Sequence, residues 1–180
     1  MAKILYESNI RKLIATIDYC FKENDKLSGL ILLYSVIDIM SWLSRDPHDA
    51  ESTKSDFIRW IEEFLLPGSN LKCTAEELYQ ARFSIIHSYI PEWGTTMNVK
   101  SDGNKITYIW GKAGKNAKDE NIKSTSRKPV TVVVNVDDFV NALKIAIQRF
   151  DNSLVDNRAL FELIEDRSRK FFGDIVNKET

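Results

Sequence analysis

The chain has 180 residues, of which 43% are hydrophobic and 28% are charged, and its formal net charge is −1. This length suits one domain with its own hydrophobic core, the composition excludes wholesale disorder, and the net charge excludes a global field that would attract a polyanion. The charge is unevenly placed: residues 94–130 hold 8 basic and 3 acidic side chains, against 10 and 14 in residues 1–93 and 7 and 9 in residues 131–180. This basic segment is interpreted either as a solvated loop or as a loop that contacts phosphate.

Cysteine usage and hydropathy indicate a reducing compartment. Cys20 and Cys73 lie on or beside helical patterns and form no disulfide framework, so we expect two free thiols that serve as packing residues. The N-terminal stretch MAKILYESNIRKL lacks the features of a signal peptide, and the longest apolar run, residues 30–37, is shorter than the roughly 20 residues that span a membrane. We therefore predict a cytoplasmic protein without membrane association. Because the histidines and cysteines are scattered, no metal and no cofactor are expected.

Three helices are predicted before Pro67. Over residues 3–24 apolar side chains recur every three or four positions, which is typical of an amphipathic helix. Residues 27–44 are apolar on nearly every side, as in the central helix of a bundle, and Pro47 should prevent this helix from continuing. His48 follows in a polar loop, where we expect it to be solvated. The third helix covers residues 53–66 and ends at the proline.

The fourth helix has the clearest start signal in the sequence. Thr74 and Glu77 have the spacing of a capping box, and Cys73 and Leu78 have the spacing of a hydrophobic staple. The helix should end near Ile90, because a proline follows.

After residue 94 the hydrophobic period becomes that of strands. Residues 95–112 predict two short strands around a turn at Asp102 and Gly103, and the β-branched run VTVVVNV at 130–136 predicts a third strand.

Two further helices close the chain. Asp137 or Asp138 is expected to cap a helix over residues 138–150, and a last helix should reach Val176, with residues 165–172 on its solvated face.

The predicted fold class is mainly α, a helical bundle with a small antiparallel β insertion at about residues 95–136. We expect a single domain over residues 1–180, in which residues 3–93 and 137–176 form the bundle and residues 94–136 form the β and loop insertion.

An arginine on the apolar side of the fourth helix is the most unusual feature of the sequence. At about 100° per residue, Arg82 falls among the apolar side chains, whereas His87 lies about 140° further round, at the border of the polar side. A guanidinium that faces a core is costly unless it is paired or reaches a wet surface. Asp38, the one acid in the second helix, is the expected partner. Such a pair is interpreted either as structural or as a device that orients Arg82 toward a phosphate.

The run Arg82-Phe-Ser-Ile-Ile-His87 resembles the R-x(4–6)-H signature of the HEPN superfamily, the higher eukaryotes and prokaryotes nucleotide-binding domains. Its setting is also similar, since ELYQARFSIIHSYIPE comes late in a bundle of about four helices, after LILLYSVIDIM and FIRWIEEFLL. The resemblance covers roughly residues 3–93. It implies a HEPN-like fold and metal-independent cleavage of RNA, in a toxin or a defence effector.

The resemblance also implies roles for particular residues. Arg82 and His87 would be the catalytic pair, because a histidine titrates near neutral pH and an arginine can hold two phosphate oxygens. Two arrangements could bring Arg82 and His87 together: the helix could loosen before Pro91, or a two-fold dimer could place both copies of this helix along one cleft. HEPN ribonucleases resemble the second arrangement, so a homodimer is expected. RNA is the expected partner, with an antitoxin or another protein as a further one. The remaining candidates, which would either hold the catalytic pair in place or contact RNA, are Asp38, Ser88, Tyr89, Lys112 and Lys115.

Two other functions stay open. Catalytic members commonly have a polar residue directly after the arginine, whereas this chain has Phe83, which favours a non-catalytic HEPN-like module that binds RNA or a protein. The remaining hypothesis is a structural interaction domain in which the pair of Arg82 and Asp38 only fixes the register of two helices.

Overall fold

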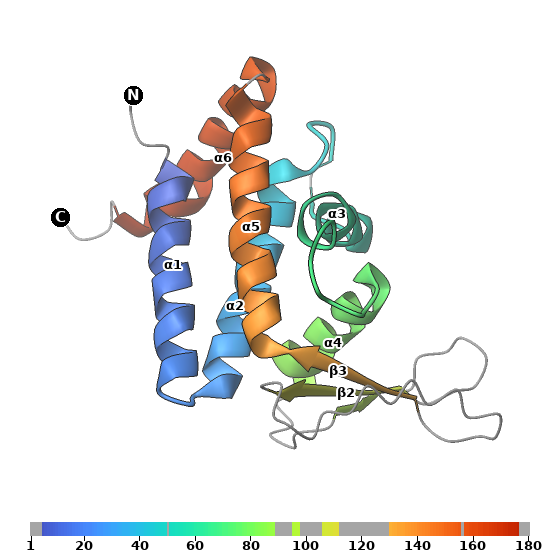
Figure 1. The fold of residues 1–180 in the computed structure, drawn as a ribbon. Coiled ribbons are helices and arrows are strands. Elements are labelled where there is room, and N and C mark those ends of the chain that lie inside the picture. Colours follow the sequence, from blue (N-terminus) through green and yellow to red (C-terminus); the bar gives the residue numbers. More distant parts are fainter. Residues whose placement is uncertain are drawn as a thin grey trace.

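The structure is a computed structural model, and it describes residues 5–49, 51–88, 95–97, 106–111, 130–155 and 157–176. The described part is mainly helical, as predicted (Figure 1). Its α-helices are α1 (Leu5–Lys22), α2 (Lys26–Ser44), α3 (Lys54–Trp60), α4 (Ala75–Ser88), α5 (Val136–Val155) and α6 (Arg158–Val176). A π-helical turn, η1 (Ile61–Leu65), continues α3 directly. The sequence predicts one uninterrupted helix over residues 53–66 and gives no sign of this change in winding.

Helix α2 is the centre of the bundle, because α1, α3, α4, α5 and α6 all pack against it. Its apolar composition fits this position. Nine of its residues, on several sides of the helix, are buried: Gly29, Leu30, Leu33, Tyr34, Val36, Ile37, Met40, Ser41 and Leu43. By length and composition alone it is also the one helix in the described part that is apolar enough to cross a membrane, and half of that stretch is buried inside the bundle. The same two properties are found in a helix that forms the core of a soluble protein.

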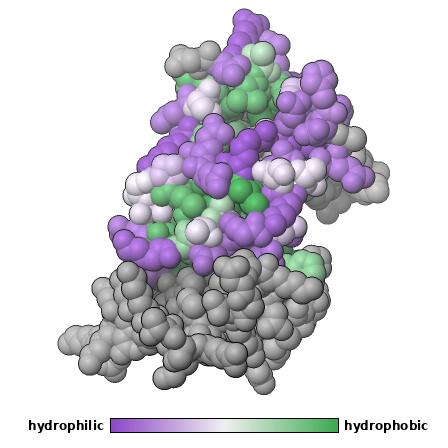
Figure 2. All heavy atoms as spheres, turned by 90° about the vertical axis from the view of Figure 1, so that its right-hand side faces the viewer, coloured by the Kyte–Doolittle hydropathy of each residue, from purple (hydrophilic) through white to green (hydrophobic). Residues whose placement is uncertain are grey.

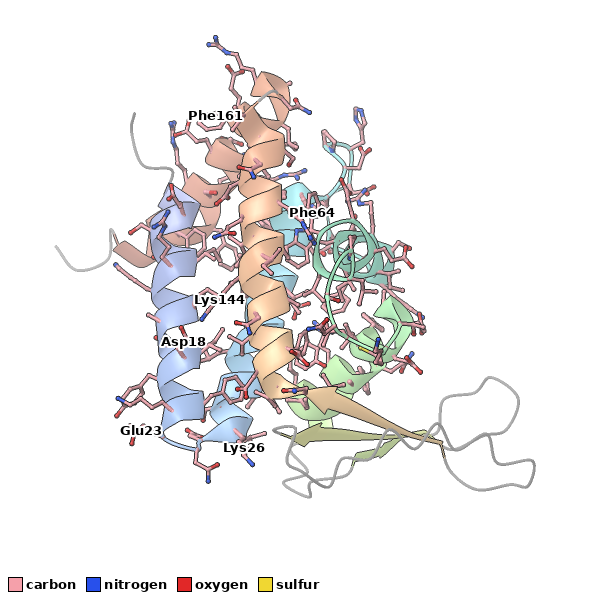
Figure 3. All side chains as sticks on the ribbon, viewed as in Figure 1. Asp18, Glu23, Lys26, Phe64, Lys144 and Phe161 are labelled. Carbon is pink, nitrogen blue, oxygen red and sulfur yellow. The ribbon has the colours of Figure 1, made fainter. Side chains whose placement is uncertain are left out.

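The core joins segments from both sides of the predicted insertion. Tyr34 of α2 meets Phe139 of α5 edge to face, with ring centroids 5.5 Å apart, and Phe64 of η1 meets Phe150 of α5 at 5.4 Å. Figure 3 shows Phe64 beside α5, and on the opposite side of that helix it shows Lys144 near Asp18 of α1. The ammonium of Lys144 lies 2.8 Å from the Asp18 carboxylate. Helix α5 is therefore held against α1 and η1 at once.

Three strands, β1 (Thr95–Met97), β2 (Ile106–Gly111) and β3 (Val130–Asn135), form one sheet in that order below α4 and α5 in Figure 1. Strands β1 and β2 are antiparallel, as predicted, and the expected turn between them lies outside the described residues. Strand β3 instead runs parallel to β2, so the prediction of an all-antiparallel sheet was wrong. A parallel pair needs a crossover of a dozen or more residues, and the 18 residues from 112 to 129 are long enough. Chain length alone leaves that choice open.

The start of α5 corrects the predicted cap. The side-chain oxygen of Asn135 accepts hydrogen bonds from the backbone N–H groups of Asp137 at 2.9 Å and Asp138 at 3.4 Å. Asn135 is therefore the capping residue, and the two aspartates occupy the first turn, where the helix dipole favours negative charge. The predicted capping box of α4 is present, with the Glu77 N–H 3.1 Å from the Thr74 hydroxyl and the Thr74 N–H 2.7 Å from the Glu77 carboxylate.

Helix α6 confirms only part of the prediction that residues 165–172 are solvated, because Asp166, Arg169 and Lys170 are exposed but three other residues are buried. Arg167 is only 5% exposed, and Ser168 and Phe172 are also buried. The Arg167 guanidinium donates to the carbonyl oxygens of Leu43 and Arg45 at 2.7 Å and of Asp46 at 3.0 Å. The last carbonyls of a helix have no partner within the helix, so Arg167 caps the C-terminal end of α2 from a neighbouring element.

Candidate functional site

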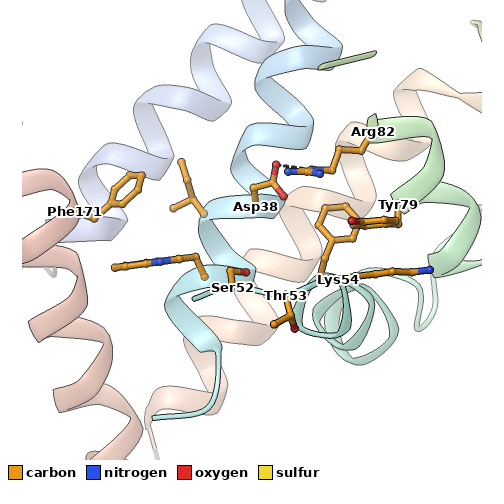
Figure 4. Close-up of a pocket in the computed structure, with 10 residues that line it drawn as sticks. Asp38, Ser52, Thr53, Lys54, Tyr79, Arg82 and Phe171 are labelled. Carbon is orange, nitrogen blue, oxygen red and sulfur yellow. Dashed lines mark hydrogen bonds and ion pairs between the residues drawn. The ribbon is translucent and has the colours of Figure 1, made fainter. Parts of the chain in front are cut away.

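The predicted pair of Arg82 and Asp38 is present between α4 and α2. The Nε of Arg82 lies 2.7 Å from Oδ2 of Asp38, and Figure 4 shows the two side chains meeting from neighbouring helices. The pair is not sealed inside the core, because the Arg82 side chain is 22% exposed and the Asp38 side chain 32%. The carboxylate therefore fixes a guanidinium that still reaches solvent.

Two aromatic rings support the same guanidinium. Its central carbon lies 5.7 Å from the centroid of Phe57 and 5.8 Å from that of Tyr79, within the range of a cation–π contact. The two rings meet edge to face at 5.4 Å. Phe57 is buried and Tyr79 is partly exposed, so the rings hold the arginine between the core and the surface.

Arg82 and Asp38 line a cleft of about 310 Å³ between α2, α3 and α4, with α6 at its far end (Figure 4). The residues that line it are Asp38, Ile39, Trp42, Ser52, Thr53, Lys54, Phe57, Tyr79, Arg82 and Phe171. Figure 2 shows the side of the molecule that carries α3 and α4 in Figure 1, where hydrophobic areas lie among hydrophilic surface of the described residues.

Lys54 is a second cation in this cleft that sequence analysis missed. Its ammonium lies 5.3 Å from the Tyr79 ring and 2.6 Å from the carboxylate of Glu76, which also accepts from the Gln80 amide at 2.9 Å. These hydrogen bonds, first that of Lys54 and then that of Gln80, lower the pKa of Glu76. Glu76 follows Lys54 by 22 positions, so the contact depends on how α3 and α4 pack, and no local pattern could have indicated it.

The aromatic end of the cleft was also missed. The rings of Trp42 on α2 and Phe171 on α6 lie 5.4 Å apart, and the Arg45 guanidinium covers Trp42 at 4.3 Å from its centroid. Phe171 is 38% exposed. Both residues have the helical spacing of core positions, and only the angle between α2 and α6 brings them to a cleft.

Several predicted residues fall outside what the structure describes. His87 and Ser88 belong to α4 by their backbone, but their side chains lie outside the described part, as do Tyr89, Lys112 and Lys115 altogether. The backbone of α4 is α-helical through Ser88, so position 87 stays about 140° around the axis from position 82. The helix does not loosen between the two positions.

Among the described residues, no group of three or more His, Cys, Asp or Glu side chains could hold a metal ion. Burial, and after it the charge of Glu77, raises the pKa of the Cys73 thiol to about 12, so this thiol stays protonated at neutral pH. Cys20 is buried and free. Both cysteines therefore act as packing residues, as predicted, and His48 is exposed in the loop after α2.

No family model, no curated protein and no solved structure matches this chain. Its function is therefore argued from the cleft itself.

Proposed function

We propose that this protein is a HEPN-like, metal-independent endoribonuclease in which Arg82 and His87 act on a phosphodiester of RNA. The observation that carries the proposal is the position of Arg82. It is five residues before His87 on one helix, paired with a carboxylate, yet partly exposed at a cleft that also contains a lysine.

Asp38 supports a phosphate-binding role for Arg82. A carboxylate that holds Nε fixes the plane of the guanidinium, and the two terminal nitrogens then define a fork that matches two phosphate oxygens. A charge that is fixed in advance stabilises a transition state without reorganising during the reaction. This is the orienting alternative that the sequence left open.

The chemistry uses only groups of the protein and of the RNA. The ribose 2′-oxygen attacks the adjacent phosphorus while its proton passes to a base, the bond to the 5′-oxygen breaks, and that oxygen receives a proton. The products are a 2′,3′-cyclic phosphate and a 5′-hydroxyl end. His87 would transfer protons near neutral pH, and Arg82 would bind the extra negative charge on the phosphate oxygens.

A two-fold dimer supports this chemistry better than one chain does. Because the backbone of α4 is regular between positions 82 and 87, these two positions lie about 140° apart around the helix axis. Pairing α4 with its copy would place Arg82 and His87 of both protomers along one groove, as an isologous interface requires. The dimer thus brings together what one helix separates.

The direct test is incubation of the purified protein with single-stranded and structured RNA in the presence of a chelator. Wild type should produce 2′,3′-cyclic phosphate ends, and Arg82→Ala should lower the rate by about 10²- to 10³-fold, as expected for loss of a donor to the transition-state oxyanion. Arg158→Ala is the matched control, because Arg158 also pairs with a carboxylate but is 91% exposed on α6. Equal rates for wild type and Arg82→Ala would contradict the proposal.

Growth provides a test of the toxin or defence role. Expression of wild type should slow the growth of the host, and His87→Ala should relieve this effect while the circular dichroism spectrum stays unchanged. A co-expressed antitoxin or partner protein should also relieve it. Toxicity that is identical in His87→Ala would count against catalysis.

One observation favours the non-catalytic alternative, a HEPN-like module that binds RNA or a protein. Phe83, directly after Arg82, is 51% exposed on α4, where an apolar ring is suited to contact with a partner. RNA binding with no cleavage of any RNA would favour this alternative. If the protein binds no RNA and Arg82→Ala lowers only its stability, the pair of Arg82 and Asp38 would serve only to fix the register of two helices.

A further inference from the structure

The cleft has two chemically different ends. Figure 4 shows Arg82, Lys54 and Tyr79 at one end and Phe171 at the other. The ring of Trp42, which also lines the cleft, lies 5.4 Å from that of Phe171, so the two rings form the second end together. Asp38 and Trp42 are four residues apart on α2, so about one helical turn, roughly 6 Å along the axis, separates the cationic end from the aromatic end. A ligand that spans this cleft therefore meets charge first and a flat apolar surface next.

The aromatic end has the properties of a stacking surface. Trp42 lines the cleft, whereas Arg45, whose guanidinium lies over the Trp42 ring at 4.3 Å from its centroid, does not. Phe171 is one of the few large hydrophobic side chains in the described part that remain exposed. Aromatic rings of this kind bind the flat face of any nucleobase, because every base has a π surface.

The charge of the cleft favours an anion. The charged side chains that line it are Asp38, Lys54 and Arg82, which together give +1. Lys54 is held by Glu76 in a pair whose two side chains are 46% and 43% exposed, and an ion pair in that setting is weak enough for a phosphate to displace the carboxylate. A purely apolar ligand or an acidic side chain without a ring would use only one end.

We propose that this cleft receives one unpaired nucleotide of an RNA strand, with its base against Trp42 and Phe171 and its phosphate between Arg82 and Lys54. Asp38 and Ser52 lie between the two ends in Figure 4, where the 2′-oxygen of the ribose would find the Ser52 hydroxyl as a donor. A volume of about 310 Å³ is small for a ligand site and admits one nucleotide but no base pair. The cleft would thus select single-stranded RNA. This inference rests on the proposed function, since it assigns the substrate strand of the same site.

The test compares three probes in a fluorescence anisotropy titration. They are a labelled decamer of 2′-O-methyl adenosine, which cannot be cleaved, the same strand annealed to its complement, and a ribose-phosphate decamer without bases. Stacking of one base on an aromatic side chain corresponds to about a 5- to 150-fold change in affinity. Trp42→Ala and Phe171→Ala should each weaken binding of the single strand within this range, and should leave binding of the duplex and of the base-free strand unchanged.

Tyr19→Ala is the matched control, because it removes an aromatic ring that is 63% exposed on α1, away from the cleft. Trp42→Phe keeps a ring at the site and should lose less affinity than Trp42→Ala. If circular dichroism shows that Trp42→Ala does not fold, Phe171→Ala at the more exposed position decides the question together with Trp42→Phe.

The possible failures are distinguishable. If wild type binds the single strand, Arg82→Ala weakens it, and the two aromatic substitutions do not, the base site is wrong and the proposed function survives. An equal loss for the base-free strand would also overturn the base site, since the rings would then act only through packing. If wild type binds none of the probes and cleaves no RNA, the proposed function fails and the base site fails with it.

Discussion

Arg82 and Arg167 show two different ways in which this bundle accommodates a guanidinium. Arg82 meets one carboxylate through Nε and stays 22% exposed beside a cleft. Arg167 is 5% exposed and donates to three backbone carbonyls at the end of α2. Burial and, after it, the nearby charge of Arg45 lower the pKa of Arg167.

The difference separates a structural arginine from one that is available to a ligand. The carbonyls that Arg167 caps would be left without partners if it turned away, so it is fixed in place by the backbone of α2. Arg82 can exchange water for another anion while Asp38 keeps it oriented. Position relative to a cleft, and the type of acceptor, therefore distinguish the two roles better than burial of an arginine does.

The largest effect is expected for Arg167→Ala. An unsatisfied buried carbonyl costs about 1–3 kcal/mol, so loss of three such bonds, partly replaced by water, should lower the free energy of unfolding by about 3–5 kcal/mol. Urea unfolding followed by circular dichroism measures this change. Arg167→Lys should recover only part of it, because an ammonium cannot reach three carbonyls with the geometry of a fork. A change below about 1 kcal/mol in the alanine variant would show that the cap contributes little.

Arg82→Lys should lower the cleavage rate strongly and the stability only slightly. Lysine keeps the positive charge near Asp38, so the free energy of unfolding should change by no more than about 1 kcal/mol. The cleavage rate should still fall by about 10- to 100-fold, because a point charge replaces a fork that can hold two oxygens. Rates and unfolding curves measured on the same preparation separate the two effects. A large loss of stability with an unchanged rate would make Arg82 an arginine of the same kind as Arg167.

Much of the helical architecture follows from the sequence because it rests on local signals. The apolar character of α2 predicts its central place, and the capping box of Thr74 and Glu77 fixes the start of α4. The parallel pairing of β3 and the π-helical turn η1 were not predictable in this way. Strand direction depends on the path of a long connection, and no local signal in residues 61–65 indicates the change in winding of η1, which packs against α5.

The candidate site was predictable only in its charged pair. A single acid in an apolar helix is the expected partner of a single arginine on an apolar face, and Asp38 and Arg82 do form an ion pair. The sequence contains no such signal for Lys54, Trp42 and Phe171. A surface lysine occurs in most bundles, and so do aromatic residues at core positions of separate helices. They become a site only through the angles at which α3 and α6 cross α2. Arg167 was mistaken for a solvated residue for the same reason.

Asp38→Asn tests how far the carboxylate orients Arg82. The amide keeps the shape and one acceptor oxygen but removes the charge, and the pair is partly exposed, so we expect a loss of about 1 kcal/mol in the free energy of unfolding. The cleavage rate should fall by more than that energy predicts if orientation matters, and nucleotide affinity should fall with it. Asp18→Asn is the control, because Asp18 pairs with Lys144 away from the cleft. Equal effects of the two variants on the rate would remove the orienting role.

The smallest effect is expected for the pair of Lys54 and Glu76, whose side chains are more exposed than those of Arg82 and Arg167. Because the pKa of Glu76 is lowered in the folded protein, its contribution to stability is complete above the ordinary glutamate pKa of about 4.3 and is lost as the pH falls through the lowered value. Wild type should therefore lose slightly more stability on acidification than Glu76→Gln, by less than about 1 kcal/mol because both side chains are well exposed. Unfolding curves at neutral pH and at about pH 3 measure this difference. The proposed phosphate site requires a weak pair, since Lys54 would have to leave Glu76 to meet a phosphate, and Glu76→Gln should correspondingly bind RNA at least as tightly as wild type. A difference of several kcal/mol, or weaker binding in this variant, would place Lys54 with Arg167 among the structural cations.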